Sequence, residues 1–300
     1  MIGLGRMGGN MALRLIESGH TVVANARTDK SVNRLKAQGA EPAYTLPQLA
    51  EKLPSPRVVW LMVPISVVDR VLSHLTPHLE SGDLVVDGGN SYYRDTLRRA
   101  EQLAAEGLRL IDVGTSGGIW GREEGYCMMV GGESEDVEMI RPFLETLAPG
   151  PERGWGHVGA VGSGHFVKMI HNGIEYGLMQ AYAEGFSLLH HKDDFDLDLH
   201  QIAQIWRHGS VIRSWLLDLT AAALADDADL TDVIPWVEDS GEGRWTVCES
   251  IDLDVAAPVI TLALQARLRS RDDEAYADRL LAVMREQFGG HEVKREPSED

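Results

Sequence analysis

The chain has 300 residues, enough for two domains of ordinary size, and its 44% apolar and 25% charged residues exclude a disordered or fibrous protein. Acidic residues outnumber basic residues by 46 to 28, and the net charge of −18 argues against a nucleic acid as partner. No apolar run reaches the roughly 20 residues that span a membrane, and the N-terminus lacks the pattern of a secretion signal, so we expect a cytoplasmic protein with no membrane partner.

The first half of the chain alternates short apolar runs with amphipathic stretches. The runs predict strands at 21–25, 58–63, 84–87, 108–113 and 127–130. The stretches between them predict helices at 31–38, 66–79, 93–106 and 135–147. Strands that alternate with helices are typical of parallel sheets, so we predict an α/β fold with a doubly wound, Rossmann-type domain over residues 1–160.

The second half is helical. Apolar spacing predicts one long helix at 166–191 and further helices at 199–207, 211–224, 258–269 and 275–288. Gly289 and Gly290 end the last of these. We therefore predict an all-α domain over residues 161–300, with the boundary near residue 160.

A glycine-rich turn opens the chain. Gly3, Gly5 and Gly8 fit the pattern G-x-G-x-x-G, with Arg6 and Met7 in its variable positions. Such glycines let the backbone approach a pyrophosphate, which the free N–H groups of the following helix stabilise. A chance match is the alternative in a chain with 31 glycines, but the strand that follows favours dinucleotide binding. Because so little precedes Gly3, we expect a shortened first strand and a natural start a few residues upstream.

The end of the second predicted strand bears on the choice of dinucleotide. An NAD site usually has an acidic residue there for the ribose hydroxyls, whereas a 2′-phosphate favours arginine and small polar groups. Residues 24–28 contain no acid and carry Arg27 beside Thr28. This pattern favours NADP over NAD, and a solvated arginine at a strand end is the alternative.

A polar stripe marks the long helix. Lys168, His171, Asn172, Glu175 and Tyr176 are spaced i, i+3, i+4, i+7 and i+8, which places them on one helical face. The lysine and the glutamate are about 10 Å apart along the axis, so they could supply a base and an acid to one substrate. A solvated face with incidental pairing is the alternative, but the hydrogen-bonding residue types favour a functional face.

Two loops follow neighbouring predicted strands. One is Asp87-Gly88-Gly89-Asn90-Ser91, and the other runs from Gly114 through Ser116, Gly117 and Gly118. Open α/β sheets bind ligands at the carboxyl ends of their strands, and the N–H groups of such a loop can hold a carboxylate or a phosphate. The two cysteines and the scattered histidines show no metal-ligand spacing, so we expect no metal.

These motifs, together with Phe288-Gly289-Gly290-His291, resemble those of the decarboxylating 6-phosphogluconate dehydrogenases, a family within the β-hydroxyacid dehydrogenase superfamily. The chain length resembles the short form of the family. The resemblance implies the oxidation of 6-phospho-D-gluconate to ribulose 5-phosphate and CO2, with reduction of NAD or NADP, in the pentose phosphate pathway. Lys168 then matches the general base, and Glu175 matches the acid that protonates C1.

The resemblance also implies binding residues and a partner. Substrate-contacting positions match Asn90, Ser116, Gly117, Gly118, His171, Asn172, Tyr176 and Arg267, together with Arg285 and His291. The cofactor-binding residues that we expect are Gly3, Gly5, Arg6, Met7, Gly8, Arg27, Thr28, Val63 and Asn90. Arg285 and His291 match a tail that enters the neighbouring subunit's site, which implies a homo-oligomer, either a dimer or a tetramer. The helical domain would then serve substrate binding and dimerisation.

One segment departs from the longer enzymes. They carry Lys-Gly-Thr-Gly-Lys-Trp-Thr where this chain has residues 240–246, Ser-Gly-Glu-Gly-Arg-Trp-Thr, so a lysine and a threonine that help hold phosphate are absent. Two other functions stay open. One is a β-hydroxyacid dehydrogenase that oxidises a small unphosphorylated 3-hydroxy acid, and the other is a non-catalytic dinucleotide sensor.

Overall fold

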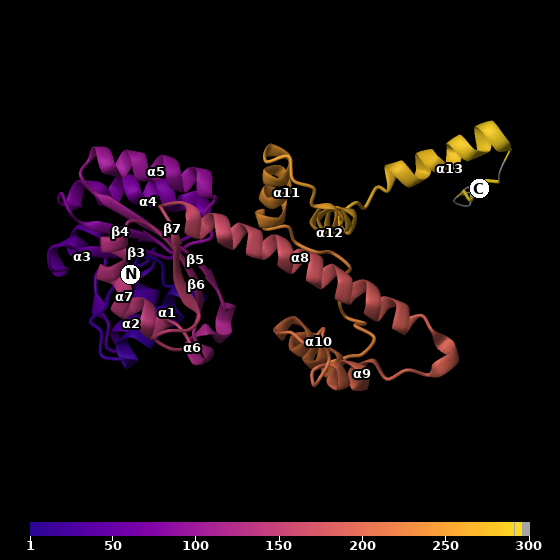
Figure 1. Cartoon of the computed structure of the whole chain (residues 1–300), viewed down its shortest axis with the longest axis horizontal. Helices are drawn as coiled ribbons and strands as arrows, with labels where there is room; N and C mark the ends of the chain where they lie inside the picture. The colour runs from indigo at the N-terminus through magenta and orange to yellow at the C-terminus, as the bar shows by residue number, and fades with distance from the viewer. Residues whose placement is uncertain (291, 296–300) are drawn as a thin grey trace. The chain divides into compact units, whose positions relative to one another are not determined.

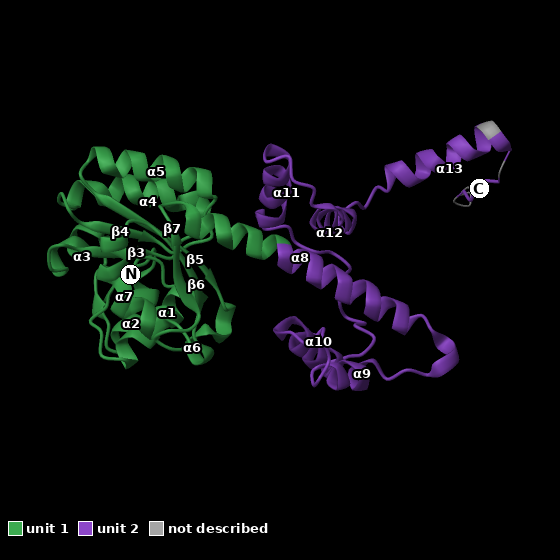
Figure 2. Cartoon of the chain, in the orientation of Figure 1, with its two compact units in different colours: residues 1–173 green, residues 174–300 purple. Residues whose placement is uncertain are grey.

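The computed structural model describes residues 1–290 and 292–295, and it divides into two compact units. The first covers Met1–Gly173 and the second Ile174–Asp300 (Figure 2). The division falls inside the long helix α8, Ser163–His190, and the expected domain boundary near residue 160 lies just ahead of this helix. Among the described helices, none combines the length and the apolar character that crossing a membrane requires.

The first unit is built around a twisted sheet (Figure 1). Five strands lie in the order β3 Val58–Leu61, β4 Leu84–Asp87, β5 Arg109–Ser116, β6 Cys127–Gly131 and β7 Trp155–Gly159. A parallel pair, β1 Val23–Ala24 and β2 Glu41–Pro42, lies beside them. Ile2 forms parallel bridges with both Asn25 and Leu61, so it takes the place of a short strand between β1 and β3.

Helices cover both faces of this sheet, as the doubly wound prediction requires. They are α1 Arg6–Glu17, α2 Asp29–Lys36, α3 Leu46–Lys52, α4 Ile65–Leu75, α5 Tyr93–Ala105, α6 Gly121–Glu124 and α7 Ser134–Leu147. Alternate strand residues point to opposite cores. Leu84 and Val86 pack in the cluster that includes α1, α2 and α7, whereas Val85 packs in the one that includes α3, α4 and α5. The α/β prediction is confirmed.

The prediction of parallel strands throughout is wrong at one pair, because β5 and β6 are antiparallel. The link between them, residues 117–126, holds only a 3-10 turn and the single helical turn α6. A parallel crossover needs a dozen residues or more, so this link returns the chain in the opposite direction. β2, β7 and α3 were not predicted, because two of them are very short and β7 is glycine-rich and largely exposed.

The second unit is helical, as predicted. It contains the end of α8 together with α9 Leu199–Trp206, α10 Trp215–Asp226, α11 Glu242–Asp252, α12 Pro258–Arg269 and α13 Tyr276–Gly289. Two small apolar clusters stabilise it, one around Phe186, Leu217 and Ala221 and another around Tyr176 and Leu264. α10 begins later than predicted because the Ser214 hydroxyl accepts the N–H of Leu217 and caps it.

Candidate functional site

The glycine turn leaves room for a ligand where the pattern predicts one. A Cβ on Gly3, whose φ is 93°, would lie 2.4 Å from the carbonyl oxygen of Met62, and a Cβ on Gly8 would lie 2.1 Å from that of Gly3. Both glycines are therefore required by close packing. A Cβ on Gly5, the residue just before α1, would meet nothing within 4 Å. This open backbone at a helix N-terminus fits a dinucleotide pyrophosphate.

The predicted cofactor residues lie around this turn. Val63 packs against Gly3, and the Gly3 N–H donates to the carbonyl of Asn25 at the end of β1. Arg27 follows there and is exposed, as is Arg6 at the start of α1. Neither arginine has a hydrogen bond or an ion pair with any other described residue. Two cations therefore remain available at the edge of the sheet where the glycine turn lies.

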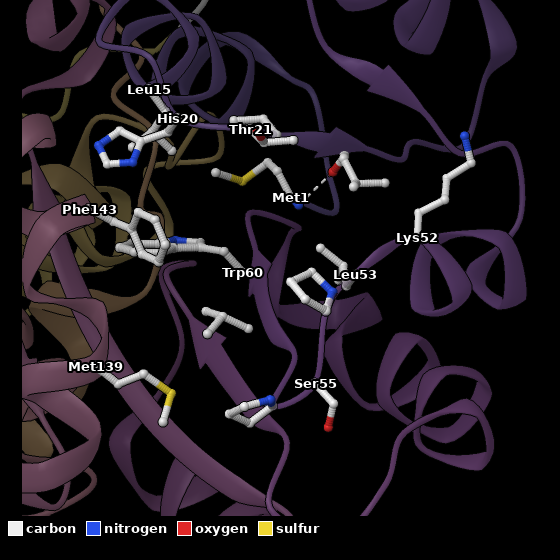
Figure 3. A pocket seen from close by; sticks show the side chains of 15 residues that line it. Met1, Leu15, His20, Thr21, Lys52, Leu53, Ser55, Trp60, Met139 and Phe143 are labelled. Atoms are coloured by element: carbon white, nitrogen blue, oxygen red, sulfur yellow. Dashed lines mark hydrogen bonds between the residues drawn. The ribbon is translucent and has the colours of Figure 1, made fainter.

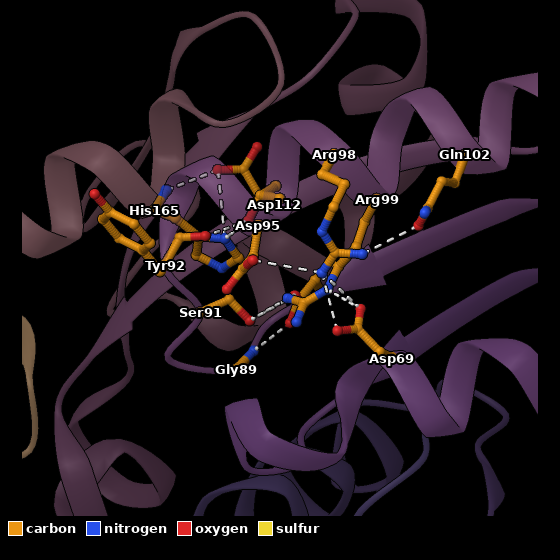
Figure 4. Close-up of polar contacts among 12 residues, drawn as sticks. Asp69, Gly89, Ser91, Tyr92, Asp95, Arg98, Arg99, Gln102, Asp112 and His165 are labelled. Atoms are coloured by element: carbon orange, nitrogen blue, oxygen red, sulfur yellow. Dashed lines mark hydrogen bonds and ion pairs between the residues drawn. The ribbon is translucent and has the colours of Figure 1, made fainter.

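Asp87 organises the loop that carries Asn90. This carboxylate is 1% exposed; it accepts the N–H of Gly89 at 3.1 Å and the hydroxyl of Ser91 at 2.7 Å. The Arg99 guanidinium lies 3.5 Å from it and donates at 2.7 Å to Asp69 (Figure 4). These contacts hold the loop at the carboxyl end of β4. The sequence motif indicated Asp87. No pattern in the sequence around Arg99 or Asp69 indicated that these residues stabilise the Asp87 carboxylate.

Lys168 lies against the next strand. Its side chain is buried, and a Cβ on Gly114 of β5 would lie 2.4 Å from the Lys168 Cβ, so the absence of a side chain on Gly114 admits the lysine. The Lys168 ammonium donates to the Asn172 side-chain oxygen at 2.5 Å and lies 3.4 Å from His171 Nδ1. The structure thus brings together three of the five residues of the predicted stripe.

The loop after β5 lies close to Lys168. Ser116 ends this strand and pairs with Cys127 of β6. Burial raises the pKa of the Cys127 thiol, and the nearby charge of Lys168 opposes that rise. Gly117 and Gly118 have φ values of 126° and 54°, and a Cβ on Gly118 would meet nothing within 4 Å. The loop therefore presents open backbone at Gly118, just after the strand against which Lys168 packs.

Glu175 and Tyr176 belong to the second unit, on the same helix as Lys168. α8 runs unbroken from Ser163 to His190, so seven residues, about two turns, separate Glu175 from Lys168. Glu175 lies at the wall of a cavity of about 700 Å³ that is otherwise lined mainly by apolar side chains of α8, α9 and α10. Tyr176 is 4% exposed, and no described residue hydrogen-bonds its buried hydroxyl.

Arg267 lies against Tyr176. Its guanidinium carbon is 3.5 Å from the centroid of the Tyr176 ring, and one nitrogen donates to the carbonyl of Glu238 at 3.0 Å. A Cβ on Gly243 would lie 2.3 Å from the same ring, so this glycine of the divergent segment is needed for packing. The structure thus brings together Tyr176 and Arg267, two of the predicted substrate residues.

The divergent segment itself is held by ion pairs. Arg244 contacts Asp239 at 2.7 Å, and Arg271 lies 3.8 Å from the same carboxylate. The buried Glu242 carboxylate accepts the Ser240 hydroxyl at 2.6 Å. Arg285 lies exposed on α13, and His291 lies outside the described residues.

The sheet also borders a cavity that does not belong to this site. Its volume is about 480 Å³, and residues at the amino ends of β1 and β3 border it, among them Thr21 and Ser55 (Figure 3). The Met1 amine donates to the carbonyl of Val23 at 2.9 Å, and burial lowers its pKa to about 5. The glycine turn and the loops described above lie at the opposite, carboxyl ends of these strands, where α/β folds bind ligands.

Comparisons with known proteins cover both parts of the chain. Residues 1–161 match the family model of the NAD binding domain of 6-phosphogluconate dehydrogenase, and residues 164–297 match that of its C-terminal domain. An NAD(+)-dependent, decarboxylating 6-phosphogluconate dehydrogenase of Haloferax volcanii is 45% identical over 297 residues, which cover 98% of each chain.

Solved structures give the same result for the fold. The 6-phosphogluconate dehydrogenase of Plasmodium falciparum matches with a TM-score of 0.83 at 28% identity, over 100% of this chain and 66% of that longer one. A 3-hydroxyisobutyrate dehydrogenase of Mycobacterium tuberculosis matches with a TM-score of 0.72 over 91% of this chain and 93% of that one. At 20% identity, the second match shows a shared fold alone.

Proposed function

The chain belongs to the 6-phosphogluconate dehydrogenase family, and on that premise we propose that it converts 6-phospho-D-gluconate to ribulose 5-phosphate and CO2 while it reduces NAD or NADP. The observation that carries the proposal is the face of α8. It presents a buried lysine hydrogen-bonded to Asn172, and two turns later a carboxyl group. A base and an acid are what an oxidation followed by a decarboxylation needs.

Each side chain has a defined task in this reaction. Lys168 takes the proton of the C3 hydroxyl, and the bound nicotinamide supplies the acceptor for the hydride that leaves C3. The protonated Lys168 then donates a hydrogen bond to the new 3-keto oxygen, which draws electrons from the C1–C2 bond as CO2 leaves. The carbon that was C2 of the substrate becomes C1 of the resulting enediol. Glu175 donates a proton to this C1, which completes ribulose 5-phosphate.

The surrounding residues suit these tasks. The side-chain oxygen of Asn172 and Nδ1 of His171 orient the Lys168 ammonium without carrying a full negative charge that would retain its proton. Asn90, on the loop held by Asp87, and residues 116–118, whose backbone is open at Gly118, bind substrate hydroxyl and carboxylate groups. Arg267, held against Tyr176, supplies a cation for the phosphate.

We propose the two domain functions that the sequence predicts: residues 1–160 bind the dinucleotide, and residues 161–300 bind the substrate and form the dimer. We also place the reaction in the cytoplasm, because a phosphorylated sugar acid does not cross a membrane unaided.

The assay that tests the proposal follows nicotinamide absorbance with 6-phosphogluconate and each cofactor in turn. We expect turnover with 6-phosphogluconate and none with 3-hydroxyisobutyrate. Turnover with the short acid alone would identify a dehydrogenase of small 3-hydroxy acids. Tight cofactor binding without turnover of either acid would identify a sensor.

Cofactor choice gives a separate prediction. We propose that NADP is favoured, because the exposed Arg27 has no partner among the described residues and Thr28 adjoins it. Charge-assisted hydrogen bonds contribute about 1.5–3 kcal/mol each, so Arg27→Asp should raise the KM for NADP roughly ten- to a hundredfold. The KM for NAD should change little. Steady-state kinetics with both cofactors measure the change.

The matched control for this substitution is Arg70→Asp, which makes the same charge change at another exposed arginine, on α4. The control should leave both KM values unchanged. An Arg27→Asp protein that uses NADP as well as the parent does would show that this arginine is a solvated surface residue.

We further propose a homo-oligomer in which Arg285 and His291 of one chain reach the phosphate of its neighbour's substrate. Apolar side chains on α12 and α13 support an interface, since Val259 is 67% exposed, Leu262 is 68% exposed and Tyr276 is 68% exposed. Ending the chain after Met284 should raise the KM for 6-phosphogluconate about tenfold or more, with cofactor affinity unchanged. Sedimentation measures the assembly, and wild-type kinetics in the shortened protein would reject the shared site.

A further inference from the structure

We propose that Asp112 is a positioning residue for the reaction: its buried carboxylate holds the first turn of α8 on the sheet and thereby sets the place of Lys168. The inference rests on the proposed role of Lys168 and adds a residue that touches neither substrate nor cofactor.

The contacts of Asp112 join β5 to the start of α8. The residue is fully buried, and one of its oxygens accepts the N–H of Gly162 at 2.6 Å. The other oxygen accepts the N–H of His165 at 2.7 Å (Figure 4). The first N–H groups of a helix have no acceptor within the helix. A carboxylate there satisfies two of them and meets the positive end of the helix dipole.

The helix and the strand also approach without side chains between them. A Cβ on Gly164 would lie 2.5 Å from the Met129 carbonyl oxygen and 2.6 Å from that of Asp112. A Cβ on Gly114 would lie 2.4 Å from the Lys168 Cβ. Because the backbone of α8 rests directly on β5 and β6, a shift of its first turn moves Lys168 with it.

His165 extends the same arrangement to α5. Its ring Nδ1 lies 2.7 Å from the Thr96 hydroxyl and 3.8 Å from the Asp112 carboxylate, and the ring is 1% exposed. Asp112 therefore sits where β5, α5 and α8 meet. A displacement of its carboxylate would therefore also shift β5, α5 and α8 at the edge of the sheet where the strands end.

A second buried aspartate stands in register with Asp112. Asp87 of β4 pairs with Asp112 of β5, and Asp87 holds the loop with Asn90 in the same way that Asp112 holds α8. Burial raises the pKa of the Asp112 carboxyl, and the charge of Asp87 acts in the same direction, while the His165 ring and the two N–H groups oppose it. Two adjacent buried carboxylates are costly for the fold, and both orient parts of the proposed site.

The chain offers a matched control at the other end of β4. Asp83 is also fully buried, and it accepts the N–H groups of Arg57 at 2.7 Å and Glu80 at 2.9 Å. It lies at the amino end of the strand, away from the glycine turn and α8. Asp83→Asn therefore makes the same substitution at an equally buried aspartate, one whose side chain also pairs with the Arg57 guanidinium at 3.0 Å.

The experiment compares kcat, KM and cofactor Kd of the two full-length variants. A misplacement of about 1 Å costs up to roughly a hundredfold in rate, so Asp112→Asn should lower kcat about ten- to a hundredfold. The cofactor Kd and the KM for 6-phosphogluconate should stay within about threefold of the parent values. Asp83→Asn should keep the parent kcat. Equal kcat values for the two variants would overturn the inference.

Two further variants keep the outcome decisive. If Asp112→Asn does not fold, Thr96→Val removes only the hydroxyl that contacts His165, and an unchanged kcat in that variant would overturn the inference. Lys168→Ala separates this inference from the proposed function. A parent-level kcat in Lys168→Ala contradicts the proposed role of the lysine. A strongly lowered kcat in Lys168→Ala beside a parent-level kcat in Asp112→Asn contradicts the role of Asp112 alone.

Discussion

Lys168→Ala is expected to lower kcat by roughly 10²- to 10⁴-fold, the range in which a positioned base contributes. The C3 hydroxyl cannot release a hydride to the nicotinamide unless a base takes its proton, and no ammonium then remains to polarise the 3-keto group. The Kd of the cofactor should stay unchanged, because the glycine turn that fits it lies elsewhere in the unit. Steady-state kinetics and fluorescence titration with reduced cofactor measure the two quantities.

A control substitution and one alternative outcome test this prediction further. Lys36→Ala removes an exposed lysine of α2 and should leave kcat at the parent value. If Lys168→Ala lost only cofactor affinity and kept kcat, the lysine would be a cofactor-binding residue and not the base.

Glu175→Gln is expected to separate the two halves of the reaction. The amide cannot donate the proton that C1 needs, so formation of ribulose 5-phosphate should slow about a hundredfold. Hydride transfer precedes that step and should proceed at nearly the parent rate. A rapid-mixing experiment should therefore show a burst of reduced cofactor, followed by slow release of product into a rapid-quench assay.

The control for this step is Glu184→Gln, a substitution nine residues further along α8 at an exposed position. It should show no burst. Product formation by Glu175→Gln that keeps pace with cofactor reduction at the parent rate would remove Glu175 from the reaction.

Much of the fold is predictable from local pattern. β4, with four fully or almost fully buried residues, and α12, which begins at a proline, lie at the predicted residues. A buried strand leaves a strong signal because most of its residues are apolar, and a proline at the first helical position marks where a helix begins. The face of α8 is also predictable, since helical spacing alone places Lys168 near Asn172.

The direction of β6 could not be read in this way. Alternation of strands and helices is typical of parallel sheets, and nothing in residues 117–126 states that the chain turns back. β7 and α11 also escaped prediction. β7 carries two glycines and exposed side chains, and α11 mixes polar and apolar residues without a clear apolar stripe. Their positions depend on contacts with distant parts of the chain.

The residues of the proposed site are also predictable only in part. Lys168, Asn90 and Ser116 lie in motifs, so the sequence indicates them. Arg99 and Thr96 act through side chains far away in sequence, and only the folded chain joins them to Asp87 and His165. One signal was present, because an aspartate within an apolar strand run, as at Asp87 and Asp112, is costly to bury unless it has partners.

The divergent segment, residues 240–246, replaces two phosphate-binding residues of the longer enzymes. Ser240 and Glu242 stand where the longer enzymes have the lysine and the threonine that help hold phosphate. In this chain the Ser240 hydroxyl donates a hydrogen bond to the Glu242 carboxylate. Arg267 remains in place against Tyr176. We therefore expect phosphate binding in this chain to depend more strongly on arginine than it does in the longer enzymes.

The central claim is that Lys168 and Glu175 act on one substrate from the same helix. A crystal structure of the protein with 6-phosphogluconate and a non-reactive cofactor analogue measures this directly. The account predicts the Lys168 nitrogen within about 3 Å of the C3 hydroxyl oxygen, with the Glu175 carboxyl directed at C2, the carbon that becomes C1 of the product. A substrate bound with C3 away from Lys168, or a Glu175 side chain turned into bulk water, would contradict it.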